Sequence, residues 1–170
     1  MKKLEATLSP RAVFTALRVA AMAAGVIGTL LAAWLLMIGG SCLSWGLNDH
    51  ASDLVGASVT GLLTVLIVSV CCWRALTVFI RMVGRLERGS AFTEENAGAL
   101  GRIATMLALS GAALLAALVL LAIICRGLAA TLLLLLLLAL AFLGLALIAC
   151  ALDVLVRRAA VLQQDSDLTI

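Results

Sequence analysis

The chain has 170 residues, of which 65% are hydrophobic and 12% charged, with a formal net charge of +3 at pH 7. Soluble domains are roughly 45–50% apolar and about 25% charged, so this composition excludes a water-soluble fold and indicates a membrane protein. It also excludes a disordered chain and a disulfide-stapled secreted domain, because the five Cys and 14 Gly follow no framework or period.

Four uncharged apolar runs follow one another along the chain, at residues 19–39, 55–73, 103–124 and 128–152. A bilayer core about 30 Å thick requires about 20 helical residues, and runs that do not alternate with polar residues are unlike barrel strands. They predict four transmembrane helices. The expected fold is an all-α integral membrane protein in which residues 1–170 form a single four-helix bundle.

The first run has a second interpretation, as a cleaved signal peptide. Lys2 and Lys3 precede it, and residues 39–42 loosely resemble a lipoprotein cleavage site. Gly39, however, stands where such sites usually carry Leu or another aliphatic residue, and the run is long for a signal sequence. We therefore expect an uncleaved anchor.

Basic residues lie almost entirely on one side of the predicted membrane. Because Lys and Arg are retained in cytoplasmic segments, both termini are predicted to be cytoplasmic, with a cytoplasmic loop at 74–102 and a tail at 153–170. The other side carries only Arg126. The eleven basic residues on the first side are Lys2, Lys3, Arg11, Arg18, Arg74, Arg81, Arg85, Arg88, Arg102, Arg157 and Arg158.

The second and fourth runs are both expected to continue as amphipathic helices on the cytoplasmic side, because apolar residues recur there at helical spacing. After the second run, Gly89 is suited to end the helix and Thr93 to start the next one. Two exposed apolar faces would be unfavourable, so we expect the extensions to pack on each other. This packing would bury Phe79, Val83, Leu155 and Leu162.

Four arginines share the arc opposite the apolar residues of the second extension. Positive charge just below a membrane is typical of a topology signal and of contact with anionic lipid headgroups. Docking of an acidic protein surface is the alternative. Direct binding of nucleic acid is not expected, because the arc is short and lacks aromatic residues for stacking. The four residues are Arg74, Arg81, Arg85 and Arg88.

Small residues recur every four positions in two of the runs, a pattern that allows close helix packing in lipid. General alanine richness explains it equally well. Seven consecutive leucines at 132–138 make the fourth run apolar on every face and suit it to lipid contact. The two rows are Ala20, Ala24, Gly28 and Ala32 in the first run, and Ala104, Ala108, Ala112 and Ala116 in the third.

Two short motifs carry a family resemblance: Gly-x-x-Phe-Thr-x-x-Asn at residues 89–96 and the terminal Asp-Leu-Thr-Ile at 167–170. With them, nearly the whole chain resembles a bacterial family of small four-span membrane proteins catalogued as domain of unknown function 2975. The resemblance implies a location in the bacterial cytoplasmic (inner) membrane. It also implies a neighbour, since members often sit beside a short helix-turn-helix regulator of the Cro type.

The same motifs supply the expected partner-binding residues. A chain end with two apolar side chains and a free carboxylate suits capture in a groove of another protein. The alternative is structural, with Phe92 anchoring the loop, Asn96 bracing it and the tail solvated. The proposed contact residues are Phe92, Thr93, Asn96, Asp167, Leu168, Thr169 and Ile170.

No catalytic, cofactor or metal site is predicted. No nucleophile has a base in a readable arrangement, and a lone His50 with Asp49 and Asp53 offers too few ligands for a metal. Cys42 and Cys125 could form a disulfide at the outer face, although free thiols are the commoner case.

We therefore expect a non-enzymatic regulatory or sensor partner of a small helix-turn-helix protein. The competing hypothesis is a small transporter or channel subunit that assembles as a homo-oligomer through the small-residue rows. Its weakness is the lack of a polar pore lining in the runs; proton-coupled transport is disfavoured because the runs contain no Lys, Arg, Asp or Glu.

Overall fold

The computed structural model of the chain describes residues 10–86, 94–124 and 129–167. These residues form four α-helices: α1 (Pro10–Asn48), α2 (Ser52–Leu86), α3 (Glu94–Ile124) and α4 (Ala129–Asp167). The described part of the chain contains no strand. Each helix is long and apolar enough to cross a membrane. The chain is therefore a multi-pass membrane protein with four transmembrane helices.

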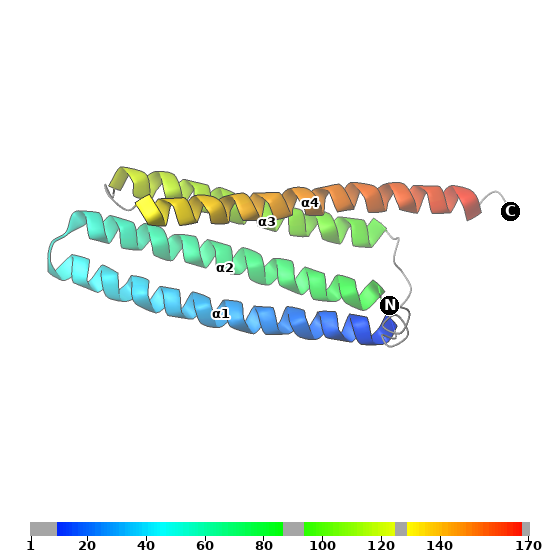
Figure 1. The fold of residues 1–170 in the computed structure, drawn as a ribbon, viewed down its shortest axis with the longest axis horizontal. Helices are drawn as coiled ribbons and strands as arrows, with labels where there is room; N and C mark the ends of the chain where they lie inside the picture. Colours follow the sequence, from blue (N-terminus) through cyan, green and yellow to red (C-terminus); the bar gives the residue numbers. More distant parts are fainter. Residues whose placement is uncertain (1–9, 87–93, 125–128, 168–170) are drawn as a thin grey trace, which may run out of the picture.

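The helices run antiparallel and pack in chain order (Figure 1). α1 contacts α2, α2 contacts α3, and α3 contacts α4, whereas among the described residues α1 and α4 do not meet. The bundle is thus open between its first and last helices. α4 contacts only α3, and most of the leucines at 132–138 are exposed, as expected for a helix in contact with lipid.

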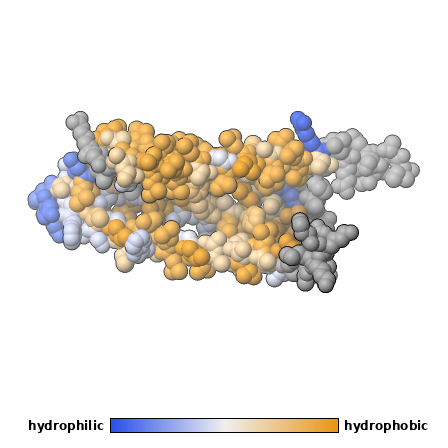
Figure 2. Space-filling model, viewed as in Figure 1, coloured by the Kyte–Doolittle hydropathy of each residue, from blue (hydrophilic) through white to orange (hydrophobic). Residues whose placement is uncertain are grey.

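The two ends of the molecule differ in charge. We call the end formed by the starts of α1 and α3 and the ends of α2 and α4 the basic end, because it carries Arg18, Arg74, Arg81, Arg85, Arg102, Arg157 and Arg158. The opposite end, which joins α1 to α2, is called the loop end. Figure 2 shows apolar residues over the middle of the molecule, with hydrophilic residues gathered at the loop end.

The uncharged length of α2 matches a bilayer. Residues 54–73 carry no charge, and 20 residues of helix span about 30 Å at 1.5 Å per residue. α2 then continues without a break to Leu86, and α4 continues past Asp153 to Asp167. Both extensions are helical, as predicted. Figure 1 shows the last turns of α4 projecting beyond the start of α3.

The core is built of small side chains. Buried apolar residues are mostly alanines, whereas the large leucines, isoleucines and tryptophans face outward. This arrangement suits a bilayer, where packing of small residues rather than hydrophobic burial brings helices together. The buried apolar residues are Ala21, Cys71, Ala75, Val83, Ala99, Leu114, Ala117, Ala139, Ala146 and Ala149.

The predicted packing of the two extensions on each other is wrong. Val83 is buried as predicted, but Leu155 is 61% exposed and α2 does not contact α4 within the described ranges. The reason is the position of α3, which packs on both α2 and α4 and separates them. The side chain of Leu162 lies outside those described.

The predicted row of α1 makes little contact within the chain, since only Ala32 of its four residues is half-buried. Ala20, Ala24 and Gly28 are exposed, and nothing lies within 4 Å of a Cβ placed at Gly28. α1 instead meets α2 through a neighbouring face that includes buried Ala21. On that face Cβ atoms would lie 2.5 Å from Leu76 at Gly25 and 2.8 Å from Leu62 at Gly39.

The α3 row is only partly used. Ala104 and Ala108 are half-buried, whereas Ala112 and Ala116 are exposed. α3 instead buries Ser110 and Gly111, which lie between its neighbours α2 and α4. α2 and α4 therefore contact faces of α3 that do not coincide with the predicted row of small residues.

Candidate functional site at the basic end

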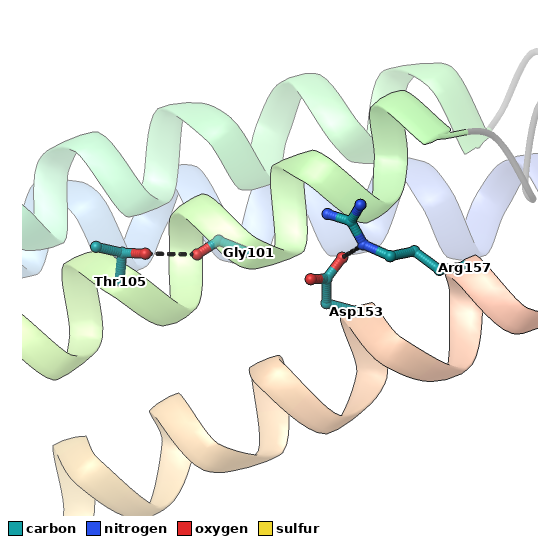
Figure 3. Close-up of polar contacts among 4 residues, drawn as sticks. All are labelled: Gly101, Thr105, Asp153 and Arg157. Atoms are coloured by element: carbon teal, nitrogen blue, oxygen red, sulfur yellow. Dashed lines mark hydrogen bonds and ion pairs between the residues drawn. The ribbon is translucent and has the colours of Figure 1, made fainter.

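At the basic end, the side chain of Asp153 in α4 lies beside α3 (Figure 3). Asp153 of α4 points at Gly101 of α3, and a Cβ placed at Gly101 would lie 3.3 Å from Asp153 Oδ2. An alanine at residue 101 would therefore require the carboxylate to shift by a few tenths of an ångström. The side chain of Asp153 is only 15% exposed.

Arg157 holds this carboxylate one helical turn away. Its Nε donates a hydrogen bond of 3.1 Å to Asp153 Oδ1, while its own side chain is 57% exposed. An acid four residues before a base is the favourable orientation on a helix, and such a pair contributes about 0.3–0.5 kcal/mol. The pair therefore orients Asp153 toward α3 more than it stabilises the fold.

Thr105 completes the group that Figure 3 shows. Its hydroxyl donates a hydrogen bond of 2.9 Å to the Gly101 carbonyl, one turn earlier in α3. The Gly101 backbone thus meets Asp153 at its Cα and Thr105 at its carbonyl oxygen. The arrangement brings a carboxylate, a guanidinium and a hydroxyl together where α3 and α4 pack on each other.

A second arginine lies between α1 and α2. The guanidinium of Arg18 lies 2.9 Å from a Cβ placed at Gly84 of α2, and Arg18 is half-buried. Asn96, near the start of α3, is 2% exposed. Arg18 is therefore packed against α2, and Asn96 is buried at the start of α3.

Within the uncharged parts of the helices, two buried hydroxyl groups donate hydrogen bonds to backbone carbonyls of their own helix. Thr64 donates to the Thr60 carbonyl at 2.8 Å, and Ser110 donates to the Met106 carbonyl at 3.0 Å. The side chains of Cys72 in α2 and Ser110 in α3 lie close to each other. A backbone carbonyl is the usual partner of a hydroxyl in hydrocarbon. These hydroxyl groups therefore have a structural role.

Two of the predicted partner-binding residues lie in described helices. Asn96 is buried, which fits the alternative that it braces the loop. Asp167 is the last residue of α4. α3 begins at Glu94, directly after the position predicted to start it. Phe92, Thr93, Leu168, Thr169 and Ile170 lie outside the described residues.

The predicted lipid-contact arginines differ in their exposure. Arg74 and Arg81 are exposed, Arg85 is half-buried and interacts within the protein, and Arg88 lies outside the described residues. Leu76, Phe79, Ile80 and Leu86 of the predicted apolar face are half-buried. Of the three described arginines of the predicted arc, two therefore face outward.

At the loop end, Cys42 is half-buried and its thiol is free, while Cys125 lies outside the described residues. Among the described residues, no three His, Cys, Asp or Glu side chains are grouped to hold a metal ion. His50 has a structural explanation instead. It adopts φ 53°, and the Ala51 N–H donates to the Gly46 carbonyl at 3.0 Å, the bond that closes a helix C-terminus in a Schellman motif.

The contact of Asp153 with Gly101 and the Gly25–Gly39 face of α1 were not predicted from the sequence. The available signal was a different spacing: Gly25, Ala32, Gly39 and Gly46 recur every seven residues rather than every four. A seven-residue repeat is typical of left-handed helix crossings, which predominate in membrane bundles.

The chain was compared with known families, curated proteins and solved structures. A family model described as "Protein of unknown function (DUF2975)" matches residues 14–170. No curated protein and no solved structure gives a significant match.

Proposed function

Since the chain belongs to the family described as "Protein of unknown function (DUF2975)", we propose a function from its own geometry: a non-enzymatic regulatory partner in the bacterial inner membrane. In this proposal it docks a small helix-turn-helix transcription regulator on its cytoplasmic side. The regulator enters through the family resemblance, in which such proteins are frequent neighbours.

One observation carries the proposal. The end of α2, the start of α3 and the end of α4 all lie at the basic end of the molecule. The loop and the tail, whose motifs are the proposed contacts, therefore leave the membrane on one side. The arginines at this end favour a cytoplasmic location, because basic residues are retained there. A partner in the cytoplasm would meet both segments together.

The test is affinity purification of the full chain in mild detergent, with the companions identified by mass spectrometry. We expect a small helix-turn-helix protein with the wild type. It should be lost when residues 165–170 are deleted and when Phe92→Ala removes the loop anchor. Arg158→Gln is the matched control, because Arg158 is exposed on α4 close to the tail, and it should retain the companion.

Equal thermal midpoints in detergent would show that the variants are folded. A companion that survives both the deletion and Phe92→Ala would overturn docking through the loop and tail. If the wild type retains only further copies of itself, the regulatory proposal is abandoned.

A homo-oligomeric transporter or channel subunit is the second proposal, and the exposed small residues of α1 support it. Ala20, Ala24 and Gly28 face away from α2 and are available to a second copy of the chain. This hypothesis predicts substrate-dependent flux in reconstituted vesicles, which the regulatory hypothesis does not.

A further inference from the structure

One face of α2 is exposed along almost its whole apolar length. Large side chains recur on it at helical spacing and are 41–58% exposed. The same face continues into two exposed arginines, Arg74 and Arg81. We call these residues the α2 stripe: Val59, Leu63, Leu66, Ile67, Val70, Trp73, Arg74 and Arg81.

The two arginines lie on the same side of α2 and carry charges that no described carboxylate neutralises. Seven residues separate them, which is two helical turns or about 10 Å along α2. Within the described ranges, neither guanidinium forms an ion pair, whereas Arg157 is paired with Asp153. Two positive charges therefore face outward from the same side of one helix.

The depth of these residues matches one leaflet of a bilayer. Arg74 directly follows the uncharged residues 54–73, so it lies where the hydrocarbon meets the headgroups. Trp73 is 53% exposed at the same level, a position that tryptophan favours in membranes. Residues 63–73 cover about 16 Å of helix, close to half of a hydrocarbon core about 30 Å thick.

We propose that the α2 stripe binds an anionic phospholipid of the leaflet at the basic end. One acyl chain lies along Leu63, Ile67 and Val70, with the glycerol region beside Trp73. The Arg74 guanidinium binds the phosphate, a group whose geometry it matches with two parallel N–H donors. Arg81, two turns farther out, attracts the net negative charge of the headgroup. The binding surface is independent of any regulator or transported substrate.

The experiment uses quenching of Trp73 fluorescence by lipids that carry bromine on an acyl chain. Trp34→Phe and Trp45→Phe leave Trp73 as the sole tryptophan of the full-length chain, which has three. The protein is reconstituted in phosphatidylcholine vesicles with either brominated phosphatidylglycerol or brominated phosphatidylcholine. The ratio of the two quenching affinities measures the preference for the anionic lipid.

We expect a preference for phosphatidylglycerol of roughly 25-fold, because each of the two basic residues near an anionic surface contributes about a fivefold gain. Arg74→Gln and Arg81→Gln should each reduce it about fivefold, and the double variant should abolish it. Arg102→Gln is the matched control, since Arg102 is exposed on α3 away from the stripe; it should leave the preference unchanged.

Equal quenching by the two lipids in the wild type would overturn the proposal. A preference that survives the double Gln variant would do the same. If that variant fails to fold, Arg74→Lys with Arg81→Lys keeps the charges and should keep a preference for phosphatidylglycerol, weakened by the loss of the two parallel N–H donors of Arg74. Raising the salt concentration should weaken the preference in the wild type, because the Debye length falls from about 10 Å at 0.1 M to about 3 Å at 1 M.

Discussion

His50 shows how a single residue ends α1. Its positive φ places it at the position after the helix C-cap, where glycine is most common. The Ala51 N–H then satisfies the Gly46 carbonyl, and α2 begins at Ser52, with Asp53 in its first turn beside the positive end of the helix dipole. The tight return between α1 and α2 therefore depends on backbone conformation, and the imidazole needs no ligand to account for it.

Replacements of His50 by glycine and by alanine should therefore differ in their free energy of unfolding. His50→Gly should be more stable than His50→Ala by about 1 kcal/mol, because alanine keeps a Cβ in the left-handed region and glycine does not. Thermal unfolding of the detergent-solubilised chain would measure the difference. Ala51→Gly, next to it, should show no such gain, and an alanine variant as stable as the glycine variant would contradict the assignment.

At the scale of helices, glycines set how closely α3 and α4 approach. A Cβ at Gly111 would lie 2.8 Å from Leu143 Cγ and 3.4 Å from the Ala139 carbonyl oxygen. The Leu143 branch point and the α4 backbone cannot move aside as easily as the tip of a side chain. Gly144 of α4, by contrast, has nothing within 4 Å of its Cβ position.

Gly111→Ala is therefore expected to lower the free energy of unfolding by about 1–3 kcal/mol, the usual cost of overpacking a tight contact. Gly144→Ala is the matched control and should be neutral or slightly stabilising, since alanine favours helix. Denaturant or thermal unfolding in detergent would measure both. Equal effects of the two substitutions would mean that α3 and α4 do not approach closely at Gly111.

At the scale of the whole molecule, the charges predict how the bundle sits in the membrane. The arginines gather at one end, and the charge-free slab lies between that end and the loop end. Retention of basic residues in the cytoplasm would place the loop end outside. Asp49 and Arg158 are both exposed and lie at opposite ends, so they are suitable positions for measuring the orientation.

In a chain whose native cysteines are replaced, Asp49→Cys should react with a membrane-impermeant maleimide in intact cells. Arg158→Cys should react only after the cells are permeabilised. Labelling in the reverse order would invert the predicted topology and place the loop and tail outside the cytoplasm. It would also exclude docking of a cytoplasmic regulator at the basic end.

The amino-acid sequence by itself determined the four helices, their approximate limits in the slab and the gathering of basic residues on one side. These features follow from hydropathy and charge along the chain, which respond to the bilayer before any helix meets another. The amphipathic continuation of α2 beyond Arg74 could also be predicted from the sequence. A helix with water on one side carries apolar residues at a regular helical spacing on the other side.

Only the tertiary structure decided which faces meet. In lipid, a leucine facing a neighbour and one facing an acyl chain are equally apolar, so hydropathy does not distinguish a seam from an outer surface. The row beginning at Ala20 therefore looked as suitable as the face beginning at Ala21. The separation of α2 from α4, and the contact of Asp153 with Gly101, likewise depend on where α3 lies, and that position is set by close backbone packing.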